Sequence, residues 1–292
     1  MSESSTELRF DKMPSVVRGF ARAAVGRKSG LREGQSIPLI RAQLPGVRPD
    51  AAHLRRYREI CGFSGEGVLP LTYPHALSAP LHMAVMTHSR FPLKLVGAVH
   101  LRNHIEQQRP LADDEELTLN VFVEGHRQVA KGLEFDLHTQ VEDAAGETVW
   151  RGVSTNFVRG GGHGEKSASS PLPDPENYRQ LDEWALDAGL GRRYGLMAGD
   201  INPIHMHPLL AKLFGFPRAI VHGMWSYARC AAALAPAQSE GPVTMDVAFR
   251  RPVLLPSKVV FRVDNPDSPT GYMMTDPAGK TLHLTGEIRI DG

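Results

Sequence analysis

The stretch Tyr194-Gly-Leu-Met-Ala-Gly-Asp200-Ile-Asn202-Pro203-Ile-His205 places a carboxylate, an amide, a turn-forming proline and an imidazole within six residues. Gly199 and Pro203 flank this polar set, and such flanking residues predict a loop. In a loop, the side chains of Asp200 and His205 are free to approach each other. A carboxylate and an imidazole that hold one water between them can work as an acid/base pair.

The same residues also allow a purely structural interpretation. Asp200 would then start a turn, and Pro203 would open a helix that runs through Leu209–Ala211. Because single short motifs are weak evidence, the spacing alone leaves the acid/base pair and the helix cap equally open.

A helix is predicted from Gly223 to Ala235, where Pro236 ends it. Arg229 is its only charged residue, so this helix is apolar or small almost all round and is expected to be buried. The backbone N–H groups at the start of such a helix can bind an anion or an oxyanion. Alternatively, Gly223 only allows a strand to approach closely.

Together these motifs resemble the MaoC-like dehydratases, which include the (R)-specific enoyl-CoA hydratases (hydratase 2). The resemblance rests on Tyr-x-x-x-Ala-Gly-Asp-x-Asn-Pro-x-His at 194–205, a Phe-Gly-Phe segment at 214–216 and His-Gly-Met at 222–224. The chain is most similar to the two-domain bacterial 3-hydroxyacyl-thioester dehydratases. This implies an α+β double hot-dog fold, in which each half wraps a curved antiparallel sheet around a long central helix.

The resemblance also implies roles for the site residues. Asp200 and His205 would be the catalytic pair, and the N–H of Gly223 would polarise the thioester carbonyl. The reaction would be reversible hydration of trans-2-enoyl thioesters to (R)-3-hydroxyacyl thioesters in fatty-acid or related acyl metabolism. No metal and no cofactor are expected, since the thioester of CoA or of acyl carrier protein is itself the substrate. The residues expected to contact the substrate are Asn202, which would also shape the loop, His222, Met224 and Arg250.

Other functions remain open. Some hot-dog proteins are acyl thioesterases, and a chain of this kind could also bind acyl thioesters without catalysis. The complete Asp-x-Asn-Pro-x-His motif favours hydration over both alternatives. Ser226 lacks the Gly-x-Ser-x-Gly surroundings of a serine nucleophile. The densest histidine group lacks nearby residues that complete a familiar metal-ligand set; it consists of His82, His88, His100 and His104.

The composition is that of an ordinary globular protein. The chain has 292 residues, of which 41% are hydrophobic and 22% charged, enough for two domains with their own cores. A formal net charge of +1 argues against a nucleic-acid surface. Cys61 and Cys230 form no disulfide framework, so a reducing cytoplasm is expected. No apolar run approaches the ~18 residues of a membrane span, and the first residues do not resemble a secretory signal.

The chain is predicted to contain two copies of one fold. An N-terminal arm (1–35) would precede a non-catalytic domain (36–159), a linker rich in Gly, Ser and Pro (160–175) and a catalytic domain (176–292). Similar sequences recur in both halves, in that Asp143–Thr148 resembles Asp276–Thr281 and Val99–Arg102 resembles Val247–Arg250. The first copy lacks the catalytic motif and would form a wall of the acyl site. The fused pair would act as an intrachain pseudo-dimer, and a homodimer of the chain remains open.

Each copy is predicted to run from a helix into four strands. The first copy would have helices at Ala51–Cys61 and Pro80–Ser89 and strands at Val96–Arg102, Glu116–Glu124, Leu133–Glu142 and Thr148–Val158. The second would have strands at Val243–Arg250, Lys258–Asp264, Gly271–Asp276 and Thr281–Ile290. Val68–Tyr73 is expected to be extended, and Tyr178–Ala188 could be helical or extended.

Overall fold

The computed structural model describes residues 5–19, 28, 30–32, 34–95, 97–160, 164–167, 173–234 and 241–291. The chain divides into two compact units. Unit 1 comprises Met1–Pro49, Pro74–Asn103 and Asp114–Ser169, and unit 2 comprises Asp50–Tyr73, His104–Asp113 and Ser170–Gly292. Two segments from the first half of the sequence therefore group with unit 2. The predicted arm, linker and two domains are continuous stretches of sequence, whereas these units are groups of residues in contact. The predicted domain limits therefore stay predictions.

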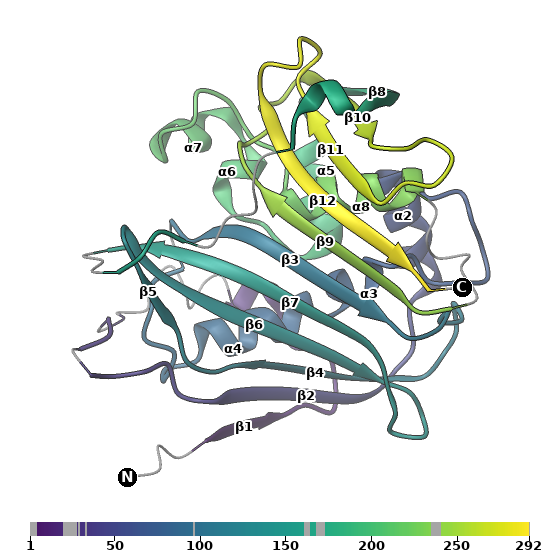
Figure 1. Ribbon diagram of the computed structural model, residues 1–292. Coiled ribbons are helices and arrows are strands. Elements are labelled where there is room, and N and C mark those ends of the chain that lie inside the picture. Colours follow the sequence, from purple (N-terminus) through teal and green to yellow (C-terminus); the bar gives the residue numbers. More distant parts are fainter. Residues whose placement is uncertain are drawn as a thin grey trace. The chain divides into compact units, whose positions relative to one another are not determined.

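Unit 1 is an α+β arrangement of a sheet with a helix against it (Figure 1). Its strands follow the order β1-β2-β4-β6-β7-β3, and β5 pairs with β6. The helix α4 (Ala79–Thr87) packs against β2 and β4, and α3 (Tyr73–Leu77) precedes it. The strands are β1 (Thr6–Arg9), β2 (Ile40–Val47), β3 (Val99–Gln107), β4 (Leu117–Val123), β5 (Arg127–Val129), β6 (Gly132–Glu142) and β7 (Thr148–Arg159).

Unit 2 has the same kind of architecture. Its sheet follows the order β9-β12-β11-β10-β8, with antiparallel neighbours throughout. The helix α8 (Gly223–Leu234) is buried, and the Tyr227 hydroxyl on it donates to the Met245 carbonyl of β9 at 2.6 Å. The other elements are α2 (Ala51–Cys61), η1 (Pro175–Asn177), β8 (Arg179–Leu186), α5 (Leu190–Ala198), α6 (Pro203–Met206), α7 (Pro208–Leu213), β9 (Val243–Phe249), β10 (Ser257–Val263), β11 (Gly271–Thr275) and β12 (Leu282–Ile290).

The strand order supports the predicted duplication. The sheet of unit 1 contains β2-β4-β6-β7-β3, and that of unit 2 contains β8-β10-β11-β12-β9. When these five strands of each unit are numbered in chain order, with β1 and β5 of unit 1 left out, both sheets read first, third, fourth, fifth, second. The repeated turn sequences also take corresponding places. Asp143 N–H donates to the Glu147 carbonyl in the β6–β7 hairpin, and Asp276 N–H donates to the Thr281 carbonyl in the β11–β12 hairpin, both at 3.0 Å.

Most predicted elements are confirmed, but each copy begins with a strand that the prediction missed or left open. In unit 1 this strand is β2, whose alternation of buried and partly exposed residues starts at Ile40. In unit 2 it is β8, so the open choice over 178–188 resolves as a strand. The extended run predicted for Val68–Tyr73 is wrong, because Val68 forms only an isolated bridge and Tyr73 begins α3. Strand β3 continues past the predicted end at Arg102 to Gln107.

The predicted N-terminal arm includes an edge strand. Thr6–Arg9 forms β1 and pairs in parallel with β2, beginning with Thr6 opposite Ile40. Further on, Gly19 lies so close to α4 that an added Cβ would stand 3.1 Å from the Cβ of Met83. The N-terminal residues that the structure describes therefore pack on unit 1, as expected for an arm. The end of the predicted helix at Ala235 and the segment 20–27 lie outside the described residues.

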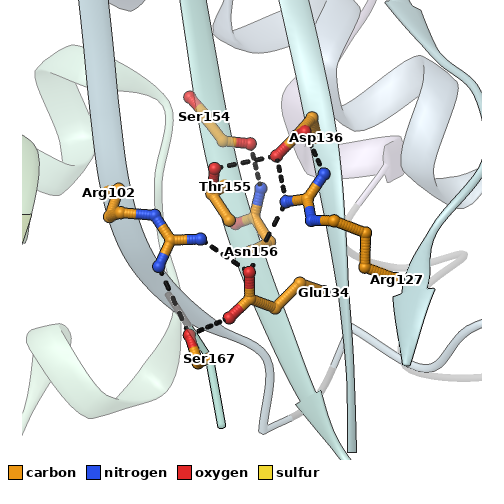
Figure 2. A network of polar contacts seen from close by, with 8 residues as sticks. All are labelled: Arg102, Arg127, Glu134, Asp136, Ser154, Thr155, Asn156 and Ser167. Carbon is orange, nitrogen blue, oxygen red and sulfur yellow. Dashed lines mark hydrogen bonds and ion pairs between the residues drawn. The ribbon is translucent and has the colours of Figure 1, made fainter. Parts of the chain in front are cut away.

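Part of the predicted linker is fixed to unit 1 by polar contacts (Figure 2). The Ser167 hydroxyl donates to the Glu134 carboxylate, and Arg102 donates to the same carboxylate at 2.6 Å. Arg127 lies 3.5 Å from this carboxylate, whose side chain is only 2% exposed. Such partners offset the cost of burying a carboxylate. Within the linker predicted from its Gly, Ser and Pro content, residues 164–167 are therefore hydrogen-bonded to the sheet.

No helix within the described part of the chain has the length and apolar character needed to cross a membrane.

Candidate active site

The polar stretch in unit 2 is a loop between two helices. The helix α5 ends at Ala198, and Gly199 has a left-handed φ of 75°, as is common after a helix end. The next helix, α6, begins at Pro203. The predicted loop is therefore confirmed up to Asn202, but His205 lies in α6, so the loop assignment was wrong for this residue.

Asn202, rather than Asp200, caps the helix that follows. The Asn202 side chain accepts from the N–H of Ile204 at 3.4 Å, and the Asp200 carboxylate accepts from the N–H of Asn202 at 3.2 Å. The predicted continuous helix through Leu209–Ala211 is two short helices, because His207 is extended (φ −154°, ψ 140°) between α6 and α7. The helix cap is therefore the side chain of Asn202, and the side chain of Asp200 is half exposed, at 50%.

His205 is held in the tautomer that a proton acceptor needs. Its Nδ1 lies 2.8 Å from the carbonyl oxygen of Ile220. Because a carbonyl oxygen can only accept, Nδ1 carries the hydrogen and Nε2 keeps its lone pair. The residue is 8% exposed. Burial lowers the pKa of His205, and the nearby Asp200 opposes this effect by raising it. The imidazole is therefore neutral and able to take a proton at neutral pH.

His222 touches both members of the predicted pair. Its ring stacks on that of His205, with centroids 3.7 Å apart and planes at 23°. Its Nε2 donates to the backbone carbonyl of Asp200 at 2.9 Å. Burial, followed by the neighbouring His205, lowers the pKa of His222 to about 3. The substrate contact predicted for His222 stays a prediction; its side chain is 3% exposed and lies against Asp200 and His205.

Asp200, His205 and His222 also form the one group of possible metal ligands among the described residues, with ligand atoms all within 4.8 Å of one another. Their distances show that the structure brings the carboxylate and the imidazole together, as the sequence predicts. A metal ion would need to lie near the plane of each ring, at about 2.0–2.1 Å from its nitrogen. Two nearly parallel rings stacked 3.7 Å apart do not direct their lone pairs to one point. The arrangement therefore suits proton transfer better than metal binding.

Gly223 is the first residue of α8, so its N–H has no acceptor within that helix. A Cβ added at this position would lie 3.0 Å from Cε1 of Phe249 in β9. The glycine therefore permits close packing against Phe249, and the oxyanion role of its N–H stays a prediction. Met224, the next residue, is 8% exposed. Arg250 directly follows Phe249, and its backbone N–H donates to the His283 carbonyl at 2.8 Å.

Two glycines in α5 support the site and were not predicted. A Cβ on Gly195 would lie 2.6 Å from the Asp200 carbonyl oxygen, and one on Gly191 would lie 2.5 Å from the His205 carbonyl oxygen. Both positions therefore allow the backbone of the catalytic segment to lie directly on α5. A glycine inside a helical pattern is the usual signal of such an approach, but α5 itself was not predicted.

Comparison with known proteins assigns the chain to a family. The family described as "MaoC like domain" matches residues 176–282. Over 284 residues the chain is 33% identical to 3-hydroxyacyl-thioester dehydratase X of Mycobacterium tuberculosis, and the match covers 94% of this chain and 98% of that protein. The chain belongs to the MaoC-like dehydratase family. This membership confirms the resemblance that the motif at 194–205 carries.

Further relatives extend the similarity of this MaoC-like dehydratase. It is 31% identical over 143 residues to enoyl-CoA hydratase 2, peroxisomal, of Arabidopsis thaliana, which covers 43% of this chain and 45% of that protein. The crystal structure of HtdX from Mycobacterium tuberculosis is similar with a TM-score of 0.74 and 30% identity, covering 86% of this chain and all (100%) of that chain. The structural match confirms the predicted α+β hot-dog fold.

Proposed function

We propose that this MaoC-like dehydratase catalyses the reversible hydration of trans-2-enoyl thioesters to (R)-3-hydroxyacyl thioesters. Its family and its named relatives are dehydratases and hydratases, which makes the chain an enzyme of the hydro-lyase type. The observation that carries the proposal is the pairing of the half-exposed Asp200 carboxylate with the buried imidazole of His205, whose Nε2 keeps its lone pair.

In the hydration direction the pair activates one water molecule. The water oxygen adds to C3 of the enoyl thioester while one member of the pair takes a proton from it. A proton is then delivered to C2, so the water supplies both the hydroxyl and the hydrogen and the atoms balance. In the reverse direction one member removes the C2 proton and the other protonates the departing hydroxyl. A neutral His205 fits these steps, because its free Nε2 can accept a proton from water or from C2. The pair then returns that same proton to C2 in hydration or to the departing hydroxyl in dehydration, so the protons balance.

The negative charge that develops on the thioester oxygen needs a donor. We place the N–H of Gly223 there, since it lies at the start of α8 without an intrahelical acceptor. A donor aimed at a developing oxyanion typically contributes about 10²–10³ in rate. The helix dipole acts in the same direction, because the N-terminus of a helix carries a partial positive charge.

The remaining site residues take supporting roles in this proposal. Asn202 shapes the loop through its cap on α6. His222 positions Asp200 through a hydrogen bond to its backbone carbonyl and His205 through ring stacking. Met224 contributes apolar surface next to the oxyanion donor. Arg250 would contact a phosphate of the thioester carrier, because it follows Phe249, the residue that packs against Gly223.

No cofactor is needed for this reaction, since water supplies both added groups. We also propose a cytoplasmic protein, because Cys61 and Cys230 are free and buried, as suits a reducing compartment. Acyl carrier protein as the carrier, the intrachain pseudo-dimer and a homodimer stay proposals. The alternatives are an acyl thioesterase and a protein that only binds acyl thioesters.

One assay separates these functions. The purified chain is mixed with trans-2-enoyl-CoA substrates of short, medium and long acyl chain, and the absorbance of the enoyl thioester conjugation is followed. A thiol reagent reports hydrolysis in a parallel reaction, and chiral analysis identifies the product. Hydration predicts loss of absorbance without free thiol and an (R)-3-hydroxyacyl product. Release of free CoA would favour the thioesterase, and binding without either change would favour the silent binder.

A further inference from the structure

The C-terminal end of α5 is capped by a side chain from a distant part of the sequence. Met197 lies three positions before Asp200, and its carbonyl is among the last four of the helix, which lack intrahelical donors. The Nε2 of His53 lies 2.8 Å from this carbonyl oxygen. Because the carbonyl can only accept, Nε2 carries the hydrogen. The helix that leads into the catalytic loop therefore ends on a hydrogen bond from α2.

The other nitrogen of the same imidazole is also engaged. Nδ1 of His53 lies 2.9 Å from the hydroxyl of Tyr73. Since Nε2 is the donor, Nδ1 is an acceptor in the neutral ring and the tyrosine hydroxyl donates to it. Tyr73 is fully buried at 0% exposure, and its ring packs edge-on against Tyr57 with centroids 5.1 Å apart. With the ring in this form, Tyr73 donates to His53 and His53 donates to Met197.

The helix that carries His53 is itself anchored at both ends. At its start, Asp50 accepts from the N–H of His53 at 2.8 Å. At its end, the indole N–H of Trp225 in α8 donates to the Ile60 carbonyl at 2.9 Å. Arg229 of α8 donates to the Gly62 carbonyl at 3.3 Å. Helix α2 is therefore fastened to α8, which begins with the oxyanion donor, and to α5, which leads to the carboxylate.

We propose that His53 is a positioning residue for the hydration reaction, which holds the Asp200 loop in place through its hydrogen bond to the Met197 carbonyl. The inference rests on the proposed function, because the loop carries the proposed acid/base carboxylate. His53 does not contact the substrate in this proposal. It acts through the end of α5, where loss of the cap lets the loop that follows move. A misplacement of about 1 Å can cost about 10² in rate.

Two substitutions separate the two hydrogen bonds. In His53→Gln the side-chain amide reaches the place of Nε2 and can still donate to Met197. In His53→Asn the shorter amide reaches only the place of Nδ1, so it keeps the contact with Tyr73 and loses the one with Met197. Both amides suit a helix about as well as histidine does, within a few tenths of a kcal/mol. We expect His53→Asn to lower kcat about tenfold with little change in KM, and His53→Gln to keep kcat within about threefold.

The readouts distinguish failure of this inference from failure of the proposed function. Absence of hydration by the unmodified chain overturns the proposed function. Independently of activity, amide hydrogen exchange of the peptide spanning 198–206 should be faster in folded His53→Asn than in the unmodified chain, and unchanged in His53→Gln. A folded His53→Asn with unchanged kcat and unchanged exchange in this peptide would overturn the positioning role. Equal loss in both variants would also overturn it, since the Met197 bond would not then be the one that matters.

Discussion

Gly195 offers the most direct test of how the backbone positions the catalytic carboxylate. It lies inside α5, where the Asp200 carbonyl oxygen would be 2.6 Å from an added Cβ. The ring carbon Cε1 of His222 and the sulfur of Met206 would each be 3.2 Å away. The neighbour that must move is backbone rather than the tip of a flexible side chain. Gly195→Ala should therefore displace the catalytic loop.

The size of the effect follows from these distances. An unstrained carbon–oxygen contact is about 3.3 Å or longer, so from 2.6 Å the carbonyl must retreat by about 0.7 Å. Such a shift is expected to lower kcat about 10- to 50-fold, given that about 1 Å can cost about 10². Overpacking destabilises by about 1–3 kcal/mol, but alanine gains about 0.5–1 kcal/mol over glycine inside a helix. The variant should therefore stay folded.

The assay compares hydration rates and thermal melts of Gly195→Ala and Leu196→Ala. Leu196 is the next residue of the same helix and is 66% exposed, so its truncation should leave both rate and melting temperature nearly unchanged. A small change in melting temperature with a large loss of kcat is the expected result for Gly195→Ala. If this variant is folded and hydrates at the normal rate, the close contact between α5 and the Asp200 carbonyl does not position the site.

Further predictions concern the reacting groups. Asp200→Asn and His205→Ala should each lower turnover at least ~10² in folded protein, whereas a capping role alone predicts a loss of about 1 kcal/mol in stability with activity retained. Gly223→Val should lower turnover about 10²–10³, because the added side chain hinders the approach of the substrate carbonyl to the backbone N–H. The melting temperature should fall less, although the side chain also meets Phe249; unchanged turnover in folded protein would move the oxyanion donor elsewhere. Burial lowers the pKa of His205, so in a plot of kcat/KM against pH the apparent pKa on the acid side should lie below the usual value of 6.5. An apparent pKa above 6.5 would contradict a neutral His205 as the base. The pKa of His222 falls from 6.5 to about 3 on folding, so between these pH values the unfolded chain binds more protons than the folded one. The free energy of unfolding should therefore decrease as the pH falls from 6.5, by up to about 1.4 kcal/mol per pH unit. Thermal melts at a series of pH values, compared with those of His222→Asn, measure this effect.

The sequence was sufficient to predict that Asp200 and His205 lie close together, because they are residues of distinct type at short spacing. Asp200 lies in the loop directly before α6 and His205 lies in α6 itself, so the short separation in sequence keeps their side chains close together. The last four strands of the second copy were also predicted to within one residue, since alternation and turn residues mark their ends. Local signals define these features, and local signals are visible in one sequence.

The residues that support the site could not be predicted, because their contacts join positions far apart in the sequence or depend on how the chain folds back. His53 meets Met197 across 144 positions of sequence, and nothing near His53 indicates that partner. Gly195 is meaningful only because the Asp200 carbonyl folds back onto it. Strand β2 was not predicted, although its buried and partly exposed residues alternate from Ile40 to Leu44. Long-range contacts therefore account for the part of the site that the sequence did not disclose.

The shared strand order shows which segment of the first copy corresponds to the one that carries the proposed acid/base pair. In both copies a long segment joins the first strand to the central helix, spanning 48–78 between β2 and α4 and 187–222 between β8 and α8. The later segment forms α5 to α7 and carries Asp200 and His205. Its earlier counterpart forms α2 and α3, and most of it, Asp50–Tyr73, groups with unit 2. There α2 contacts both α5 and α8. The counterpart of the segment that carries Asp200 and His205 thus packs against α5 and α8, so the proposed site is supported by residues that its own half of the sequence does not contain.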